Sequence, residues 1–217
     1  MQDSVAFVGL GYIGLPTAVV MANSGLNVIG VDVMQEKVDA VNAGKVTIVE
    51  PGLEEELNEA LALGKFRAST EMPEADAYVI AVPTPFQSDY SVDMRFIYSA
   101  AEAIAPKLKG GELIVLESTS PPLTTQRMAE RVIELRPEFV IDGQENPENK
   151  PTIYFAHCPE RILPGKAMEE LRTNDRIIGG MSPTATEKAR DVYASFCRGE
   201  LLETNDRTAE LAKLTEN

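Results

Sequence analysis

The sequence predicts an α/β fold built on a doubly wound, mostly parallel sheet of the Rossmann-like type, ending in an incomplete C-terminal helix. The first observation is that short apolar runs alternate with longer helical stretches, a pattern typical of βαβ units. The second is that residues 5–8 are apolar without interruption, as expected of a strand buried on both faces. The third is that Gly9, Gly11 and Gly14 form a G-x-G-x-x-G motif directly after this strand, with helical residues following.

This alternation of strands and helices continues along the whole chain. The predicted strands cover residues 5–8, 27–32, 66–69, 78–82, 113–116, 152–156 and 177–178. The predicted helices cover residues 13–23, 35–43, 52–62, 96–108, 125–135 and 206–217, with a further helix starting at Ser182-Pro183. Ser is a good N-cap and Pro suits the first helical position. We interpret the acidic run 50–59 as a solvated helix face and the breaker-rich segment 137–151 as a surface loop.

Composition and charge exclude several classes of protein. The chain has 217 residues, with 20 Lys and Arg against 34 Asp and Glu, so its formal net charge is −14. It therefore lacks the basic excess with which a nucleic-acid binder neutralises phosphates. No apolar run reaches the roughly 20 residues that cross a bilayer, and the first residues lack the basic region of a signal peptide. Cys158 and Cys197 are interpreted as reduced thiols, so we expect a cytoplasmic protein; with a single His, we expect no metal site.

The glycine motif carries the strongest functional prediction. Gly9 permits a tight turn, Gly11 lets the backbone approach a pyrophosphate, and Gly14 allows the helix to pack closely on the sheet. The N–H groups and dipole of the helix N-terminus favour the diphosphate charge. Asp32, at the end of the second strand, would accept hydrogen bonds from the adenosine ribose and repel a 2′-phosphate, which favours NAD over NADP. The alternatives are FAD, S-adenosylmethionine, or a glycine turn that only packs a helix on a strand.

Polar side chains follow the next strands at the same edge of the predicted sheet. Two prolines flank Thr84 and end the fourth strand, so the Thr84 hydroxyl could face a cofactor, or the segment could be a rigid turn. Residues 117–122 place further hydroxyls, including that of Thr119, at this edge. Thr124 or Thr125 could cap the following helix.

A thiol, a carboxylate and a guanidinium follow the sixth strand. Cys158 is interpreted as a packing residue rather than a nucleophile, because a free Cys at the end of a buried strand usually packs. His157 is interpreted as a structural hydrogen-bonding residue, and Glu160 and Arg161 could form an ion pair with each other. On the last predicted helix, Lys213 and Asn217 lie four residues apart and share a face, although a solvated helix end explains them equally well.

Together these segments resemble the nucleotide-sugar 6-dehydrogenase family, which includes the UDP-glucose, GDP-mannose and UDP-N-acetylmannosamine dehydrogenases. The matching segments, in the family's order, are VGLGYIGLP (8–16), VPTP (82–85), ESTSPP (117–122), CPERILPG (158–165), NDRIIGG (174–180) and AKLTEN (212–217). The PERxxPG form looks most like the UDP-N-acetyl-D-mannosamine dehydrogenases of bacterial surface polysaccharide synthesis. The resemblance implies an NAD-binding domain at residues 1–203 and the truncated start of a central helix at residues 204–217.

The family oxidises the 6-hydroxyl of a UDP- or GDP-sugar to a carboxylate with two NAD in succession. By resemblance, this chain is the NAD-binding part of such an enzyme, acts on a UDP-sugar, and belongs to a full-length homodimer. The residues that the resemblance assigns to NAD are Gly9, Gly11, Tyr12, Ile13, Gly14, Asp32, Thr84, Thr119 and Thr125. Those that it assigns to the sugar or to catalysis are Glu160, Arg161, Ile162, Lys213 and Asn217.

One departure from the family limits what this chain is expected to do. The family's Cys nucleophile lies in a Gly-rich segment well downstream of residue 217, and Cys158 does not match that motif. We therefore expect NAD binding without turnover. The open alternatives are another UDP- or GDP-sugar 6-dehydrogenase, a related 6-phosphogluconate or 3-hydroxyacid dehydrogenase, and a non-catalytic NAD-binding module. The related dehydrogenases lack the PERxxPG and KLTEN segments.

Overall fold

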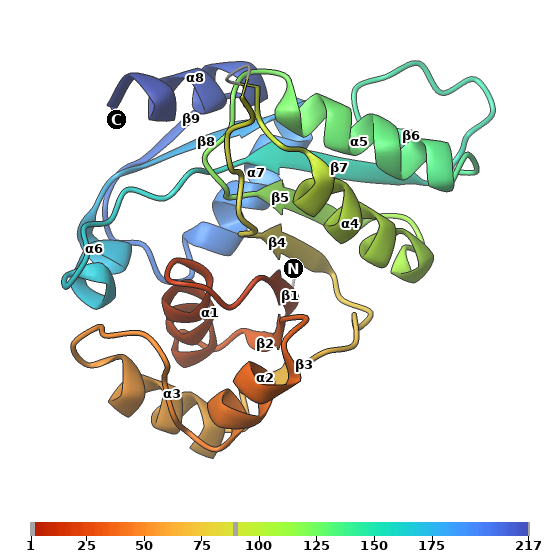
Figure 1. Ribbon diagram of the computed structural model, residues 1–217. Coiled ribbons are helices and arrows are strands. Elements are labelled where there is room, and N and C mark those ends of the chain that lie inside the picture. Colours follow the sequence, from red (N-terminus) through yellow and green to blue (C-terminus); the bar gives the residue numbers. More distant parts are fainter. Residues whose placement is uncertain (1–2, 89–90, 217) are drawn as a thin grey trace.

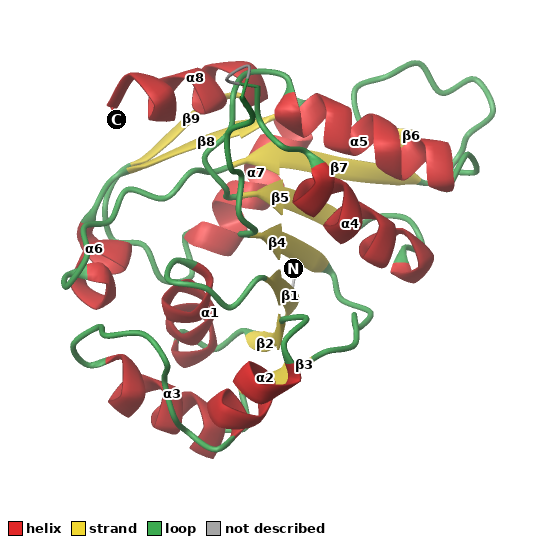
Figure 2. Ribbon diagram, viewed as in Figure 1, coloured by secondary structure: helices red, strands yellow, loops and turns green. Residues whose placement is uncertain are grey.

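A β-sheet forms the centre of the computed structural model, and helices cover both of its faces (Figures 1 and 2). The structure describes residues 3–88 and 91–216. Its strands are β1 (Ser4–Val8), β2 (Asn27–Val31), β3 (Phe66–Ser69), β4 (Ala77–Ile80), β5 (Leu113–Leu116), β6 (Val140–Ile141), β7 (Thr152–His157), β8 (Arg176–Gly180) and β9 (Leu201–Asn205). Its helices are α1 (Gly14–Asn23), α2 (Gln35–Asn42), α3 (Leu53–Ala62), α4 (Arg95–Ile104), α5 (Thr124–Leu135), α6 (Ala167–Thr173), α7 (Pro183–Tyr193) and α8 (Asp206–Glu216), with a 3-10 turn, η1 (Ala105–Lys107), after α4.

The order of the strands predicts where a ligand would bind, at the carboxyl ends of β1 and β4. The sheet runs β3-β2-β1-β4-β5-β7-β8-β9, and β6 pairs with β7 beside this path. All pairings from β3 to β7 are parallel, and β8 is antiparallel to β7. The direction of winding reverses between β1 and β4, and open α/β sheets bind ligands at such a point, outside the carboxyl ends of the strands. The predicted fold class, a doubly wound and mostly parallel sheet, is confirmed.

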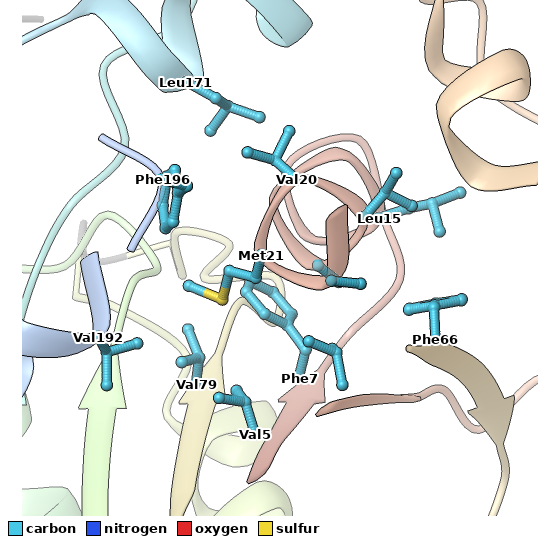
Figure 3. Packing of buried hydrophobic residues seen from close by; sticks show 14 of the residues in the cluster. Val5, Phe7, Leu15, Val20, Met21, Phe66, Val79, Leu171, Val192 and Phe196 are labelled. Carbon is cyan, nitrogen blue, oxygen red and sulfur yellow. The ribbon is translucent and has the colours of Figure 1, made fainter. Parts of the chain in front are cut away.

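Successive residues of each central strand enter two separate hydrophobic cores. On β1, Val5 and Phe7 pack into the core under α1, whereas Ala6 and Val8 pack into the core under α4 and α5. This follows from the alternation of side chains along a strand, and it requires the uninterrupted apolar runs seen in the sequence. In Figure 3, Met21 of α1 lies against Phe7 in the middle of the first core.

The second half of the chain holds elements that the sequence did not predict. Segment 137–151 is not a plain surface loop, because it contains β6 and buries Phe139 and Ile141 to 4% and 3% exposure. The sequence analysis also did not predict the strand β9 or the helix α6. The predicted helix 96–108 is shorter in the structure, because α4 ends at Ile104 and η1 follows it. Pro106, within η1, has no N–H and cannot continue the helical hydrogen bonding.

Candidate functional site

The glycine loop between β1 and α1 has the geometry of a diphosphate cradle. Gly9 has a φ of +97°, and a Cβ there would lie 2.5 Å from the carbonyl oxygen of Ala81 on the neighbouring segment. A Cβ on Gly14 would lie 1.8 Å from the carbonyl oxygen of Gly9, so only glycine lets α1 start this close to the strand. A Cβ on Gly11 would meet no atom within 4 Å, so its backbone is open to a ligand. The three glycines therefore fit the three predicted roles.

The N-terminus of α1 lacks a capping side chain. Its N-cap residue, Ile13, makes no side-chain cap hydrogen bond, and the first turn carries no acidic residue. The first N–H groups of a helix need partners from outside the helix, and a bound anion can supply them. The end of α1 thus suits the charge of a dinucleotide, in a chain whose overall charge would repel it.

Asp32 lies directly after β2 and is 8% exposed, and both of its carboxylate oxygens accept hydrogen bonds. Its Oδ2 accepts hydrogen bonds from the N–H of Leu10 at 3.1 Å and from Nζ of Lys37 at 2.7 Å, and its Oδ1 accepts one from the N–H of Met34 at 3.1 Å. Burial opposes ionisation of Asp32, but the hydrogen bonds from Lys37 and the two amides outweigh it and lower the pKa. Asp32 is therefore a fixed carboxylate that also ties the glycine loop to the end of β2.

The loops after β4 and β5 are joined to each other beside the glycine loop. The Thr84 hydroxyl donates to the carbonyl oxygen of Thr119 at 2.7 Å, and the Ser118 hydroxyl donates to that of Val82 at 2.7 Å. Together with Ile13, Ala81, Pro83, Glu117 and Glu160, these residues line a hollow at the carboxyl edge of the sheet. The structure thus brings together predicted residues from four separate segments.

Thr125 does not line this hollow and instead contacts the helix α8. Its hydroxyl and its N–H both donate to Oε1 of Glu210 at 2.7 Å, and the N–H of Leu123 donates to Oε2 at 2.7 Å. The expectation that Thr124 or Thr125 caps α5 is wrong, because the N-cap is Leu123, without a side-chain cap bond. The fully buried carboxylate of Glu210, on α8, supplies that capping contact instead.

The loop after β7 meets α8 through two ion pairs. Oε1 of Glu160 lies 3.2 Å from Nζ of Lys213, and Nη2 of Arg161 lies 2.9 Å from Oε1 of Glu216. The alternative in which Glu160 and Arg161 pair with each other is therefore wrong. Lys213 is only 8% exposed, so a solvated helix end does not describe it. Ile162, the other predicted residue of this loop, donates its N–H to Oε2 of Glu160 at 3.0 Å. Asn217 lies outside the described residues.

A buried ion pair under the hollow was not foreseen from the sequence. Glu117 and Arg176 are 0% and 2% exposed, and Oε1 of Glu117 lies 3.0 Å from Nη1 of Arg176. The guanidinium also stacks over the ring of Tyr193, 4.9 Å from the centroid. Burial raises the pKa of Glu117 to about 7, against the opposing effect of Arg176. The sequence signal was a Glu at the end of an apolar strand, which needs a partner when buried.

His157, at the end of β7, and Cys158, just after it, are both buried, and Sγ of Cys158 lies 3.9 Å from Nη1 of Arg176. Cys158 is 0% exposed, and burial raises the pKa of its thiol to about 12, so it stays a protonated packing residue as expected. His157 is also 0% exposed, and burial lowers the pKa of its imidazole to about 3. Neither ring nitrogen meets the geometry of a hydrogen bond to a residue among 3–88 and 91–216, although a contact with the backbone of Leu116 partly opposes the effect of burial on this pKa. The interpretation of His157 as a structural hydrogen-bonding residue therefore stays a prediction.

Comparison with known proteins agrees with this geometry. The model of the UDP-glucose/GDP-mannose dehydrogenase family, NAD binding domain, matches residues 3–197. The chain belongs to this family. The match confirms NAD as the cofactor and excludes the FAD and S-adenosylmethionine alternatives. No helix within the described part of the chain is long and apolar enough to span a membrane.

Individual members of the UDP-glucose/GDP-mannose dehydrogenase family are similar over nearly all of this chain. It is 50% identical to the UDP-N-acetyl-D-mannosamine dehydrogenase of Escherichia coli strain K12, over 99% of this chain and 50% of the relative. It is 49% identical to the NDP-N-acetyl-D-galactosaminuronic acid dehydrogenase of Ralstonia nicotianae, with the same coverage of each chain. The solved UDP-N-acetyl-mannosamine dehydrogenase of Staphylococcus aureus is 44% identical with a TM-score of 0.90, over 99% of this chain and 50% of that one. The chain thus spans about half the length of the curated relatives it matches.

Proposed function

We propose that this chain binds NAD across the carboxyl ends of β2, β1, β4 and β5. The observation that carries the proposal is the open face of Gly11 above the uncapped N-terminus of α1, where the sheet reverses its winding. The backbone of Gly11, Tyr12 and Ile13 would hold the pyrophosphate. Asp32 would accept from the adenosine ribose, and the hollow beside Thr84 and Thr119 would take the nicotinamide end.

The same edge of the sheet supports a role in oxidising a UDP-sugar, and we propose UDP-N-acetyl-D-mannosamine as the sugar nucleotide. Bound NAD accepts a hydride. Glu160 lines the nicotinamide hollow and is held by Lys213, so a carboxylate and an ammonium stand together where an alcohol would lose its proton. The ammonium would stabilise a developing oxyanion, and Arg161 and Ile162 lie on the same loop to contact the sugar nucleotide. Asn217 keeps its proposed role beside the substrate. Thr125 is 0% exposed and binds Glu210 with its hydroxyl and its N–H, so any role it has for the cofactor would be exerted through the position of α5 and α8.

Turnover requires more than these residues. We propose that residues 1–203 form the NAD-binding domain, that residues 204–217 begin a central helix, and that the family's nucleophilic Cys comes from chain beyond residue 217. By itself the chain would then bind NAD without producing NADH from the sugar. We further propose a cytoplasmic enzyme that works as a homodimer in its full length, as the resemblance to the family implies.

The test is a binding titration followed by a turnover assay. Calorimetry with the chain should detect NAD and show much weaker binding of NADP, because the fixed carboxylate of Asp32 repels a 2′-phosphate. Equal affinity for both would remove Asp32 from the ribose, and no binding of either would refute the proposal. Steady NADH production from UDP-N-acetyl-D-mannosamine by the chain alone would contradict the assignment of the nucleophile to residues downstream.

A further inference from the structure

Glu50 is a buried carboxylate that joins the glycine loop to the loop after β7. It is 6% exposed and lies before α3, so it is not part of the solvated helix face that the acidic run predicted. Its Oε2 accepts hydrogen bonds from the hydroxyl of Tyr12 and from the N–H of Gly165 at 2.9 Å. Its Oε1 accepts one from the N–H of Ala167 at 2.7 Å. One side chain thus connects segments more than a hundred residues apart in the sequence.

The donors keep Glu50 charged at this place. Burial opposes its ionisation, but the hydrogen bonds from Tyr12, Gly165 and Ala167 together lower its pKa. A carboxylate that accepts several such bonds is a firm anchor, since bonds to a charged acceptor are roughly twice as strong as neutral ones. The Tyr12 hydroxyl also accepts from the N–H of Gly165 at 3.0 Å, so Tyr12 contacts the second loop directly as well.

The part of the loop that Glu50 holds has little apolar burial of its own. The loop runs from the end of β7 to the start of α6; Cys158 and Ile162 at its beginning pack on the first core, but residues 163–166 are exposed, and Leu163 is 60% exposed. Segments with few buried apolar contacts open at low free-energy cost, so polar anchors decide how well they are ordered. The same loop carries Glu160 and Arg161, which pair with α8. The contacts to Glu50 therefore fix one end of the loop that presents these two side chains.

Tyr12 lies inside the glycine motif, between Gly11 and Gly14, where the proposed pyrophosphate would contact the backbone. A ligand that orders this backbone also orders the Tyr12 side chain and its bonds to Glu50 and Gly165. We propose that Glu50 is a positioning residue that, through Tyr12, couples NAD binding to the placement of the loop carrying Glu160 and Arg161. This inference rests on the proposed NAD site and adds a link from that site to the substrate side.

Hydrogen exchange at the amides of Gly165 and Ala167, followed by NMR with and without saturating NAD, tests the coupling. In the wild-type chain, NAD should slow exchange at both amides by about fivefold or more, the lower end of typical couplings between sites. The Tyr12→Phe variant keeps the ring and leaves Glu50 with its backbone donors, including Gly165 and Ala167. In this variant the amides of Gly165 and Ala167 should therefore stay protected from exchange without NAD, but NAD should slow their exchange by less than about twofold. In the Glu50→Gln variant both amides should exchange faster than in the wild-type chain, whether or not NAD is present.

Two matched controls carry the same chemical changes elsewhere. Tyr98 is a half-buried residue of α4, the helix that covers the second core, and Glu59 is an exposed residue of α3, so the controls are Tyr98→Phe and Glu59→Gln. Both should keep the wild-type response to NAD. A merely structural role of Tyr12 and Glu50 would change exchange equally with and without NAD. A wild-type chain that binds NAD with unchanged exchange, or a Tyr12→Phe chain with the full response, would overturn the coupling alone. A wild-type chain that binds no NAD would overturn the proposed function and the coupling with it.

Discussion

Nζ of Lys213 on α8 lies 3.2 Å from Oε1 of Glu160, which follows β7, and both side chains are largely buried, at 10% and 15% exposure. The Coulomb attraction within a close, largely buried ion pair is stronger than within a surface pair. Removing one partner of such a pair therefore destabilises the fold more. The pair therefore fixes α8 on the rest of the chain at the point where the proposed chemistry takes place.

We predict that Lys213 and Glu160 are energetically coupled. A double-mutant cycle with Lys213→Met and Glu160→Gln, measured by urea unfolding, should give an interaction energy of about 0.5–3 kcal/mol. The exposed pair of Lys109 and Glu74, at 67% and 62% exposure, is the control, and its interaction energy should be clearly smaller because solvent and salt screen an exposed pair. Equal values for the two pairs would mean that α8 is not held by this contact.

Asp32 should contribute to NAD affinity through its charge. Replacing it with Asn keeps the shape but removes a charge-assisted hydrogen bond of about 1.5–3 kcal/mol, so calorimetry should show NAD binding weakened by about 10- to 150-fold. Asp39→Asn, an exposed change on α2, is the control and should leave the affinity unchanged. Unaltered binding by the Asp32→Asn chain would show that its carboxylate serves only Leu10, Met34 and Lys37.

Glu117 should make stability fall as the pH rises through the weakly acidic range. Its pKa is about 7 in the fold against an ordinary 4.5, chiefly because of burial, so between these values the native chain holds a proton that the unfolded chain has released. Stability falls with pH wherever the native state binds more protons. Relative to a Glu117→Gln variant, the wild-type free energy of unfolding should therefore decrease from about pH 4.5 to pH 7. A pH-independent difference between the two chains would show that Glu117 is ionised throughout.

His157 gives the opposite pH dependence and a direct spectroscopic test. Burial lowers its pKa from 6.5 to about 3, so the native chain keeps it neutral while the unfolded chain takes up a proton below pH 6.5. This group therefore costs stability as the pH falls from 6.5 toward 3, and His157→Gln should remove that loss. Because the chain has a single His, its ring resonances can be followed alone in an NMR titration. They should not shift between about pH 8 and pH 5, and a midpoint near 6.5 would place the ring in water.

The first half of the fold could be predicted because its signals are local. The apolar strand at residues 5–8, the glycine motif and Asp32 lie within one βαβ unit, and each leaves its mark in the sequence. The strand β9 leaves little mark, because it is mostly exposed and has no alternating apolar face. The elements β6 and α6 are shorter than the windows in which periodicity can be recognised.

The contacts within the site could not be predicted for a different reason. Three buried carboxylates bind residues from distant segments of the chain. Glu50 accepts from Ala167, 117 residues away; Glu117 accepts from Arg176, 59 residues away; and Glu210 accepts from Thr125, 85 residues away. An acidic residue that will be buried looks the same in a sequence as one that stays in water. The prediction therefore named the side chains at the sheet edge, while the carboxylates that orient them emerged only from the structure.

The last prediction separates stability from binding at the glycine loop. Gly11→Ala places a Cβ where no atom lies within 4 Å, and the φ of Gly11 is not positive, so the fold should lose nothing and could gain about 0.4–1 kcal/mol. That Cβ would stand where the pyrophosphate approaches, so NAD binding should be lost in calorimetry. Gly14→Ala is the matched contrast, because its Cβ would lie 1.8 Å from the carbonyl oxygen of Gly9 and should prevent folding. A Gly11→Ala chain that still binds NAD would place the diphosphate away from this loop.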